Sequence, residues 1–153
     1  LLREGHHRIK NSLQGLAALL HRHAGATGTQ GAVLNEAVGQ VRAIAATDGV
    51  VGVIFAGLYL APFGQRTVTA VVRHMEAIRD LVGARHVALG SDFDGFIIPV
   101  RGLATAAAFP VLTATMLARG WRPDDIRGAL GENAARVFRA HEPESADGVR
   151  GCN

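Results

Sequence analysis

The stretch HVALGSDFDGF, His86–Phe96, joins an apolar run to two acidic residues. Val87–Leu89 is a short, uninterrupted apolar run of the kind found in a strand that is buried on both faces of a parallel sheet. A Gly-Ser pair follows it, and then come Asp92 and Asp94, one residue apart. The stretch therefore predicts a strand whose carboxyl end carries two carboxylates.

The residues before this stretch complete a strand–helix–strand unit. Val50–Phe55 is a second apolar, β-rich run, and Thr67–Leu81 carries apolar residues at helical spacing before Gly83. A strand, a helix and a strand in this order are typical of a parallel βαβ unit. We therefore predict an α/β fold with parallel strands at Val50–Phe55 and His86–Ser91.

Three further helices are expected after the acidic pair. Phe96–Ala108 has no regular period, and proline and glycine residues mark helix starts and ends beyond it. The predicted helices cover Pro110–Ala118, Pro123–Leu130 and Glu132–Ala140, the last with Val137 and Phe138 facing inward. The segment 142–153 shows no periodicity, and we expect it to be a disordered tail.

Asp92 is the leading candidate for a functional residue. Ligands of parallel α/β sheets bind beyond the carboxyl ends of the strands, where Asp92 is expected to lie. A carboxylate there could bind a metal or transfer a proton, or it could only cap a turn. A calcium loop is excluded, because DFDG (Asp92–Gly95) lacks the further oxygen ligands and the closing Glu at the required spacing. Local reasoning leaves the functional and the capping interpretations open.

A longer set of motifs resembles a known family. GVVGVIF (49–55), VVRHMEAIRDLVGARHVALGSDFDG (71–95), FPVLTATMLARGW (109–121) and DDIRGALGENAARVF (124–138) occur in the order seen in the C-terminal part of the membrane (renal-type) dipeptidases, peptidase family M19. The resemblance covers about residues 47–141. It implies strands seven and eight of a (β/α)₈ TIM barrel that hydrolyses dipeptides with zinc. It also implies that Asp92 contacts the substrate and handles the proton of the metal-bridging water, while Asp94 belongs to the loop.

Other parts of that family's site are not expected in this chain. The family's zinc ligands and its substrate-binding Arg come from segments upstream of the match, and no His-x-Asp pair occurs in the sequence. His74 is assigned to the solvent side of a helix, and His86, at the start of a strand, to a structural position. We therefore expect no metal site, no zinc bound by the chain alone and no independent activity. The chain also departs from the family at Ile54 and Ala56, where Asn and Tyr are common, and at 104–108. The side chains that line the substrate site are therefore expected to differ.

The first 46 residues form a different pattern. Apolar residues at helical spacing on both sides of a Gly-rich turn predict a helical hairpin over residues 1–46, the second helix with Leu34, Val38, Val41 and Ala45 on one face. REGHHRIKNSLQ (3–14) resembles the dimerisation and phosphoacceptor region of HWE-type sensor histidine kinases. The resemblance implies that His7 is the phosphoacceptor and that two hairpins form a four-helix bundle. His21 and His23 are assigned to an exposed helix surface.

The chain therefore resembles two families, which meet near residue 46. One interpretation is a dipeptidase fragment over 47–141; the alternatives are a dimerising phosphoacceptor module or a fusion without activity. No ATP-binding domain of a kinase follows the hairpin. Because the first residue is not methionine, we expect the chain to be a piece of a longer reading frame.

Composition restricts the remaining partners. The net charge is +3, and the Arg residues are scattered without interleaved aromatics, so we expect no nucleic-acid binding. Cys152 is the single cysteine, which excludes a disulfide within the chain. The longest apolar run, Val50–Leu60, is too short to span a bilayer. We therefore expect a cytoplasmic protein whose partners are a dipeptide and, through residues 1–46, a second copy.

Overall fold

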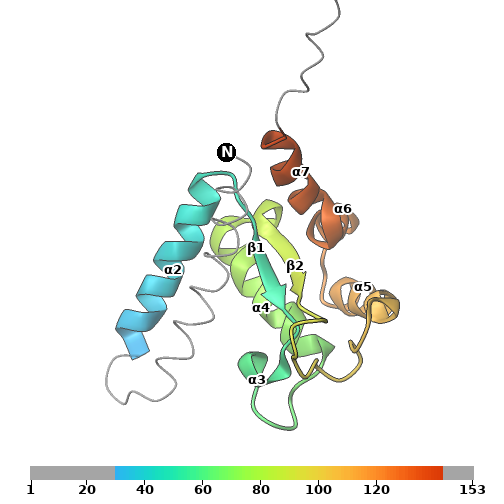
Figure 1. The fold of residues 1–153 in the computed structure, drawn as a ribbon. Coiled ribbons are helices and arrows are strands. Elements are labelled where there is room, and N and C mark those ends of the chain that lie inside the picture. The colour runs from blue at the N-terminus through green and yellow to red at the C-terminus, as the bar shows by residue number, and fades with distance from the viewer. Residues whose placement is uncertain (1–29, 143–153) are drawn as a thin grey trace, which may run out of the picture.

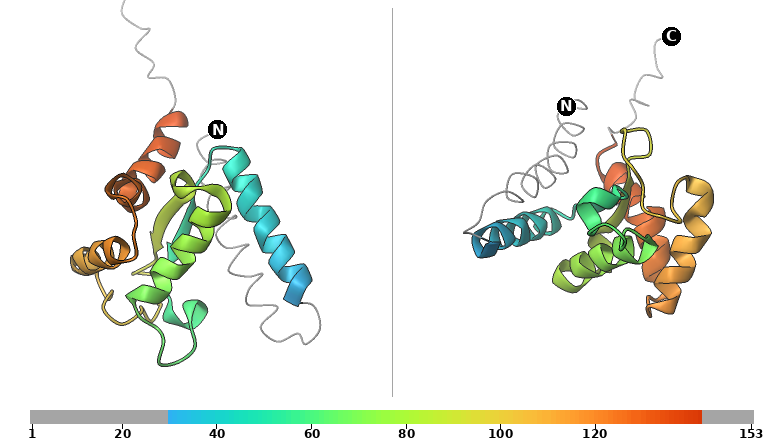
Figure 2. Two further views of the ribbon diagram at one scale, coloured as in Figure 1. Left: turned by 180° about the vertical axis from the view of Figure 1, so that it is seen from behind. Right: turned by 90° about the horizontal axis from the view of Figure 1, so that it is seen from below.

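The computed structural model describes residues 30–142 of the chain (Figures 1 and 2). Helices surround a short central sheet. In chain order the elements are α2 (Gln30–Ala46), β1 (Val51–Ile54), α3 (Gly57–Leu60), α4 (Val68–Val82), η1 (Ala84–His86), β2 (Val87–Ser91), η2 (Ala106–Ala108), α5 (Phe109–Ala118), α6 (Pro123–Arg127), η3 (Gly128–Glu132) and α7 (Asn133–Ala140).

The two strands are parallel, with α4 as the crossover helix between them. Their register starts with Val51 opposite Val87 and ends with Ile54 opposite Ser91, with an irregularity after Val53. In Figure 1 both arrows point toward the end of the molecule where α3 lies. The predicted βαβ unit is therefore confirmed, and its strands begin and end within one residue of the predicted bounds.

Two glycines allow the strands to approach closely. A Cβ on Gly52 would lie 3.2 Å from the Cα of Gly90, and a Cβ on Gly90 would lie 3.1 Å from the carbonyl oxygen of Gly52. Real Cβ atoms rarely come this near to backbone atoms, so larger residues at either position would push the strands apart. On this face of the sheet, neither strand therefore carries a side chain at these two positions.

The hydrophobic core lies on the other face of the sheet, among α4, α5 and α6. Val53 and Val87 point toward α4, whose buried residues at helical spacing include Val71, Val72 and Met75. Fourteen buried residues form one cluster: Val53, Phe55, Val68, Val71, Val72, Met75, Val87, Val100, Leu103, Leu112, Met116, Trp121, Ile126 and Ala129. Val71, Val72 and Met75, on the apolar side of the helix predicted over 67–81, are thus buried in the core.

Helix ends follow the expected residue types. α4 stops at Gly83, whose φ of 97° is a conformation that a side chain would disfavour. Proline lies in the first turn of both α5 and α6, and Gly120 (φ 80°) follows α5. The helices predicted over 67–81 and 110–118 are confirmed to within one residue.

The C-terminal helices differ from the prediction in two ways. The helix expected over 123–130 is α6 followed by the π-type turn η3, which has a kink at Gly131. Phe138 was predicted to face inward, and this is wrong: it is 56% exposed, while Val137 is partly buried. Because α7 is the last described helix and packs on η3 and β2 with one side, Phe138 falls on the open side.

Helix α2 packs against α4, on the opposite side of the strands from α5 (Figure 1). Of its predicted apolar face, Val41 is buried, Val38 and Ala45 are partly buried, and Leu34 is 65% exposed. The other predicted hairpin helix, with His7, His21 and His23, lies outside the described residues, as does the tail from residue 143. Across the part of the chain that is described, no helix combines the length and apolarity that crossing a membrane requires.

Candidate active site

Asp92 directly follows β2, at the carboxyl end of the parallel strands. Its side chain is exposed, and its backbone has a φ of 64°. Asp is one of the few residues other than glycine that adopt this left-handed conformation readily. The carbonyl oxygen of Asp92 accepts a 3.0 Å hydrogen bond from the N–H of Gly95, which closes a tight turn. The turn thus presents a carboxylate outward at the edge where parallel sheets bind ligands.

The next residue, Phe93, anchors this turn in the core. Its ring lies 5.5 Å from the ring of Phe55 in an edge-on arrangement and 6.3 Å from that of Phe109, nearly stacked. Phe55 and Phe109 also meet edge-on at 6.2 Å. Aromatic pairs at these separations attract beyond their buried area. Phe93 is thus partly buried, whereas Asp92 beside it is exposed.

Gly95 leaves room for that carboxylate. A Cβ on residue 95 would overlap Oδ1 of Asp92 and would lie 2.6 Å from Oδ2. The Asp92 side chain therefore lies over the backbone of Gly95. Any larger residue at position 95 would displace the carboxylate.

The segments that follow β1 and β2 meet at the same edge. The N–H of Val100 donates to the carbonyl of Phe55, and that of Gly57 to the carbonyl of Ile98, at 3.0 Å each. Ala56 is buried in this junction. Several large apolar side chains on these segments are exposed: Leu58, Tyr59, Phe63, Phe96 and Ile98. The edge that presents Asp92 is therefore mainly apolar.

A groove of about 440 Å³ lies where α3 leads into α4. Its lining includes Thr67, Arg73 and His74 together with Leu60 and neighbouring loop residues. Nδ1 of His74 pairs with the carbonyl of Ala70 one turn back, so this histidine keeps the helix-surface position that was predicted for it. The open shape of the groove and its mixed lining identify no particular ligand.

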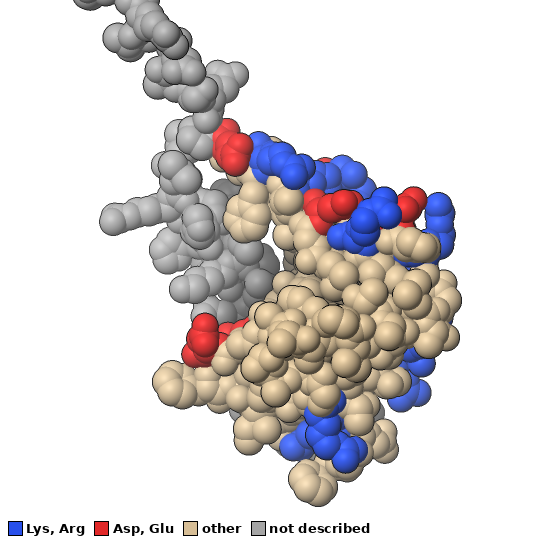
Figure 3. Space-filling view, turned by 90° about the vertical axis from the view of Figure 1, so that its right-hand side faces the viewer, with Lys and Arg blue, Asp and Glu red and all other residues tan. Residues whose placement is uncertain are grey.

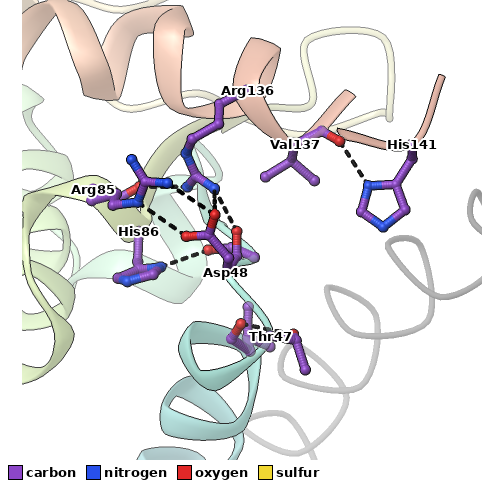
Figure 4. A network of polar contacts seen from close by, with 9 residues as sticks. Thr47, Asp48, Arg85, His86, Arg136, Val137 and His141 are labelled. Carbon is purple, nitrogen blue, oxygen red and sulfur yellow. Dashed lines mark hydrogen bonds and ion pairs between the residues drawn. The ribbon is translucent and has the colours of Figure 1, made fainter. Parts of the chain in front are cut away.

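A polar network joins the opposite, amino end of the strands (Figure 4). Arg85 donates to both carboxylate oxygens of Asp48, at 3.0 and 2.9 Å, and Arg136 of α7 donates to the backbone carbonyl of Asp48 at 2.7 Å. The hydrogen bonds from Arg85, together with the nearby positive charge of Arg136, hold the pKa of Asp48 below its usual value. Nδ1 of His86 pairs with the carbonyl of Gly49 at 2.7 Å. The network ties three elements together far from Asp92, so His86 has the structural position predicted for it.

The described residues do not fit a metal centre. Within residues 30–142, no three His, Cys, Asp or Glu side chains come together as metal ligands would. Asp92 has Asp94 as its acidic neighbour in the turn, and both side chains are exposed. No hydrogen bond or ion pair joins the Asp92 carboxylate to another described side chain. What the arrangement offers is one accessible carboxylate on a firmly anchored turn.

The fold and this edge define a broad class: a parallel α/β unit with an acidic residue at the carboxyl end of a strand. The chain belongs to the membrane dipeptidase family, peptidase family M19, whose family model matches residues 19–148. The matched range begins inside the segment 1–46 for which a kinase-type hairpin was predicted, and it extends the range of about 47–141 inferred from the motifs.

Individual relatives agree with this membership. The chain is 38% identical over 104 residues to an uncharacterized protein from the pqqA 5′ region of Klebsiella pneumoniae, covering 65% of this chain and 38% of that one. It is 37% identical over 79 residues to the dipeptidase verJ of Clonostachys rogersoniana, covering 52% of this chain and 20% of that one. The chain thus spans well under half the length of these relatives.

The fold is also that of solved dipeptidases. A metallopeptidase from Rhodobacter sphaeroides, solved with a phosphinate mimic of the dipeptide L-Ala-D-Ala, is 34% identical and superimposes with a TM-score of 0.59. A second metallopeptidase, the dipeptidase AC of family M19, has the same identity and TM-score. The chain covers 30% and 31% of these two structures, and 67% of its own length is matched in each.

Proposed function

We propose that this chain forms strands seven and eight of a dipeptidase barrel and contributes Asp92 to the hydrolysis of dipeptides. The observation that carries the proposal is the position of Asp92, exposed at the carboxyl end of β2 in a chain of family M19. Barrel enzymes place their catalytic side chains at this end of the strands. In this assignment β1 is strand seven and β2 is strand eight.

Asp92 would act as the proton-transfer group. A carboxylate in contact with the substrate can accept a proton from the attacking water and return it to the leaving amine, a role that contributes about 10² to 10⁴ in rate. The anchored Phe93 fixes the turn that carries Asp92, and the small Gly95 leaves the space that its carboxylate occupies. The substrate class follows from the relative that was solved with a dipeptide mimic.

We further propose that the chain alone does not hydrolyse dipeptides. The family is one of metallopeptidases, and the residues described here do not group into a metal-ligand set. The zinc ligands implied by the resemblance would come from segments of the barrel that this chain does not match. Asp92 is then one contribution to a site that other parts of a dipeptidase complete.

A chimera tests the role of Asp92. Residues 47–141 of this chain would replace the matching segment of the Rhodobacter sphaeroides enzyme, and hydrolysis of L-Ala-D-Ala would be measured. We expect an active chimera whose kcat falls at least about 100-fold on Asp92→Asn. Asn adopts the left-handed conformation as readily as Asp, so this substitution removes the carboxylate without changing the turn.

The matched control is Asp94→Asn, which changes the other acid of the turn and should leave kcat within about threefold. Equal losses for both variants, or full activity of Asp92→Asn, would remove Asp92 from the reaction. The phosphoacceptor role of His7, the division of the chain at residue 46 and the cytoplasmic location stay predictions.

A further inference from the structure

The two strands fall out of step near their carboxyl ends. Val53 of β1 lies opposite Leu89 of β2, but the next residue, Ile54, lies opposite Ser91 rather than Gly90. Gly90 is therefore an extra residue in β2, which makes this point a β-bulge. Bulges occur next to active sites, where they change the direction of the side chains that follow. The bulge thus decides on which face of the sheet Ser91 lies.

Ser91 lies on the face of the sheet that points away from the hydrophobic core. Residues directly opposite each other in a ladder share a face, and successive residues of a strand alternate between faces. Val53 belongs to the core cluster, and Leu89 opposite it packs against that cluster. Ile54 is partly exposed and does neither, so it lies on the other face. Ser91, opposite Ile54, shares that face.

This face would turn toward the inside of a barrel. In a (β/α)₈ barrel the helices form an outer ring, and the face of the strands that they do not cover points to the barrel axis. Helices α4 and α5 both contribute to the core cluster, on the opposite face from Ser91. Figure 3 faces this helical side, where an uncharged area lies between two groups of charged side chains. In the strand assignment proposed above, Ser91 therefore lies on the inner face.

The position of Ser91 along the strand places it at the substrate end. It is the last residue of β2 and directly precedes Asp92. Barrel enzymes bind their substrates at the carboxyl ends of the strands, so an inner-face residue at this end lines the site. Ser91 and Asp92 would then face the same substrate.

The hydroxyl group of Ser91 has hydrogen-bonding capacity that the described residues do not use. Ser91 is partly exposed, and its backbone carbonyl accepts a 3.2 Å hydrogen bond from the N–H of Phe55. Within residues 30–142, no hydrogen bond involves its side chain. On the same face, Gly52 and Gly90 present no side chain that would crowd this hydroxyl.

We propose that Ser91 is a substrate-binding residue, whose hydroxyl donates a hydrogen bond to an oxygen atom of the bound dipeptide. This inference rests on the proposed function, since it requires that β2 line a dipeptidase site. Adjacent Cα atoms are about 3.8 Å apart, so the hydroxyl can reach atoms close to those that the Asp92 carboxylate contacts. A dipeptide offers acceptor oxygens in its peptide carbonyl and its carboxylate, and a hydroxyl can donate to such an oxygen.

The kinetics of the dipeptidase chimera test this role. A hydrogen bond that is equally strong with the substrate and with the transition state affects KM and leaves kcat unchanged. Ser91→Ala should raise KM for L-Ala-D-Ala about 3- to 10-fold, with kcat within about twofold. Ser91→Thr keeps the hydroxyl and should keep KM within about twofold of the wild type. The matched control is Thr47→Ala, which removes an exposed hydroxyl before β1, at the amino end of the strands, and should leave KM unchanged.

Alkylation gives a second readout that needs no turnover. In a chimera with Ser91→Cys, iodoacetamide should modify position 91, which mass spectrometry detects. The phosphinate mimic of L-Ala-D-Ala, at about ten times its Kd, should slow this modification about 10-fold, because it occupies the site. Thr47→Cys should react at the same rate with and without the mimic.

The outcomes separate this inference from the function on which it rests. An unchanged KM in Ser91→Ala, or equal alkylation of Ser91→Cys with and without the mimic, would overturn the role of Ser91. A loss of kcat in Asp92→Asn would still support the proposed function in that case. If Ser91→Thr raises KM as much as Ser91→Ala does, the effect comes from packing and the hydroxyl has no role. Full activity of Asp92→Asn would instead contradict the proposed function itself.

Discussion

The side-chain amide of Asn133, the first residue of α7, donates a 2.8 Å hydrogen bond to the backbone carbonyl of Val87, the first residue of β2. The same nitrogen lies 2.8 Å from the carbonyl of Ala84. Gly128 makes room for this amide, because a Cβ there would lie 3.0 Å from Oδ1 of Asn133. The strand that leads to Asp92 is thus held at its start by a residue 46 positions away.

Asn133→Ala should therefore destabilise the fold. The change leaves two partly buried carbonyl groups without their donor, which costs about 1 to 3 kcal/mol of unfolding free energy. Urea denaturation followed by circular dichroism measures the loss. Asn35→Ala, on the exposed surface of α2, is the control and should change stability by less than about 0.5 kcal/mol. Equal stability of both variants would contradict the anchoring role.

Asp48 should make the stability of the chain sensitive to acid. Its pKa is lowered in the folded state, chiefly by the hydrogen bond from Arg85, so its contribution to stability is present above the unfolded pKa of about 3.9. That contribution is lost as the pH falls through the lower folded pKa. Asp48→Asn should therefore lose less stability than the wild type between pH 7 and pH 3, measured by urea denaturation at each pH. Asp80→Asn is the control variant. If the stability of Asp48→Asn depends on pH in the same way as that of the wild type, this linkage is excluded.

Phe93 should contribute to stability through its aromatic contacts. Phe93→Ala removes the ring that packs against Phe55 and Phe109, and we expect a loss of about 3 kcal/mol. Phe93→Leu keeps most of the volume and should cost about 1 kcal/mol. Thermal denaturation of both variants gives the comparison. If the alanine variant is as stable as the leucine variant, the ring does not anchor the turn.

Gly95→Ala should impair the proposed activity more than the stability. The three atoms nearest to the added Cβ all belong to the side chain of Asp92, which can rotate, so the unfolding free energy should change by less than about 1 kcal/mol. Displacing that carboxylate should lower kcat of the dipeptidase chimera by about 10- to 100-fold.

A double variant tests whether Gly95 acts through Asp92. In the chimera, Asp92→Asn combined with Gly95→Ala should be no slower than Asp92→Asn alone, because the group that the alanine displaces is already inactive. A further loss in the double variant would mean that residue 95 affects the reaction by another route.

The βαβ unit was predictable because its signals are local and strong. Val87–Leu89 and Val50–Phe55 are apolar runs with a glycine at one end, and the helix between them has a regular apolar side that ends at Gly83. Phe138 was misplaced because helical spacing shows that a residue shares a face with its neighbours but not whether another element covers that face. Such coverage depends on tertiary contacts that no short window contains.

The site was predictable at Asp92 but not in the residues that support it. The position of Asp92 follows from the end of a strand, a signal within the chain. The roles of Phe93 and Gly95 depend on contacts with Phe55, with Phe109 and with the Asp92 carboxylate itself, which appear only in three dimensions. A glycine three residues after an acid in a strand-end turn was the available signal for the space that the carboxylate needs.

The π-type turn η3 fixes the chain length between α6 and α7. Such a turn holds one residue more than an α-helical turn. The extra residue is absorbed within the turn, so α7 keeps the orientation in which Arg136 reaches Asp48 and Asn133 reaches the start of β2. Inserting a further residue after Gly131 would exceed what the turn absorbs, and every following side chain would rotate by about 100° about the helix axis. Insertions there should therefore be far less acceptable than point substitutions, although Gly131 itself is exposed.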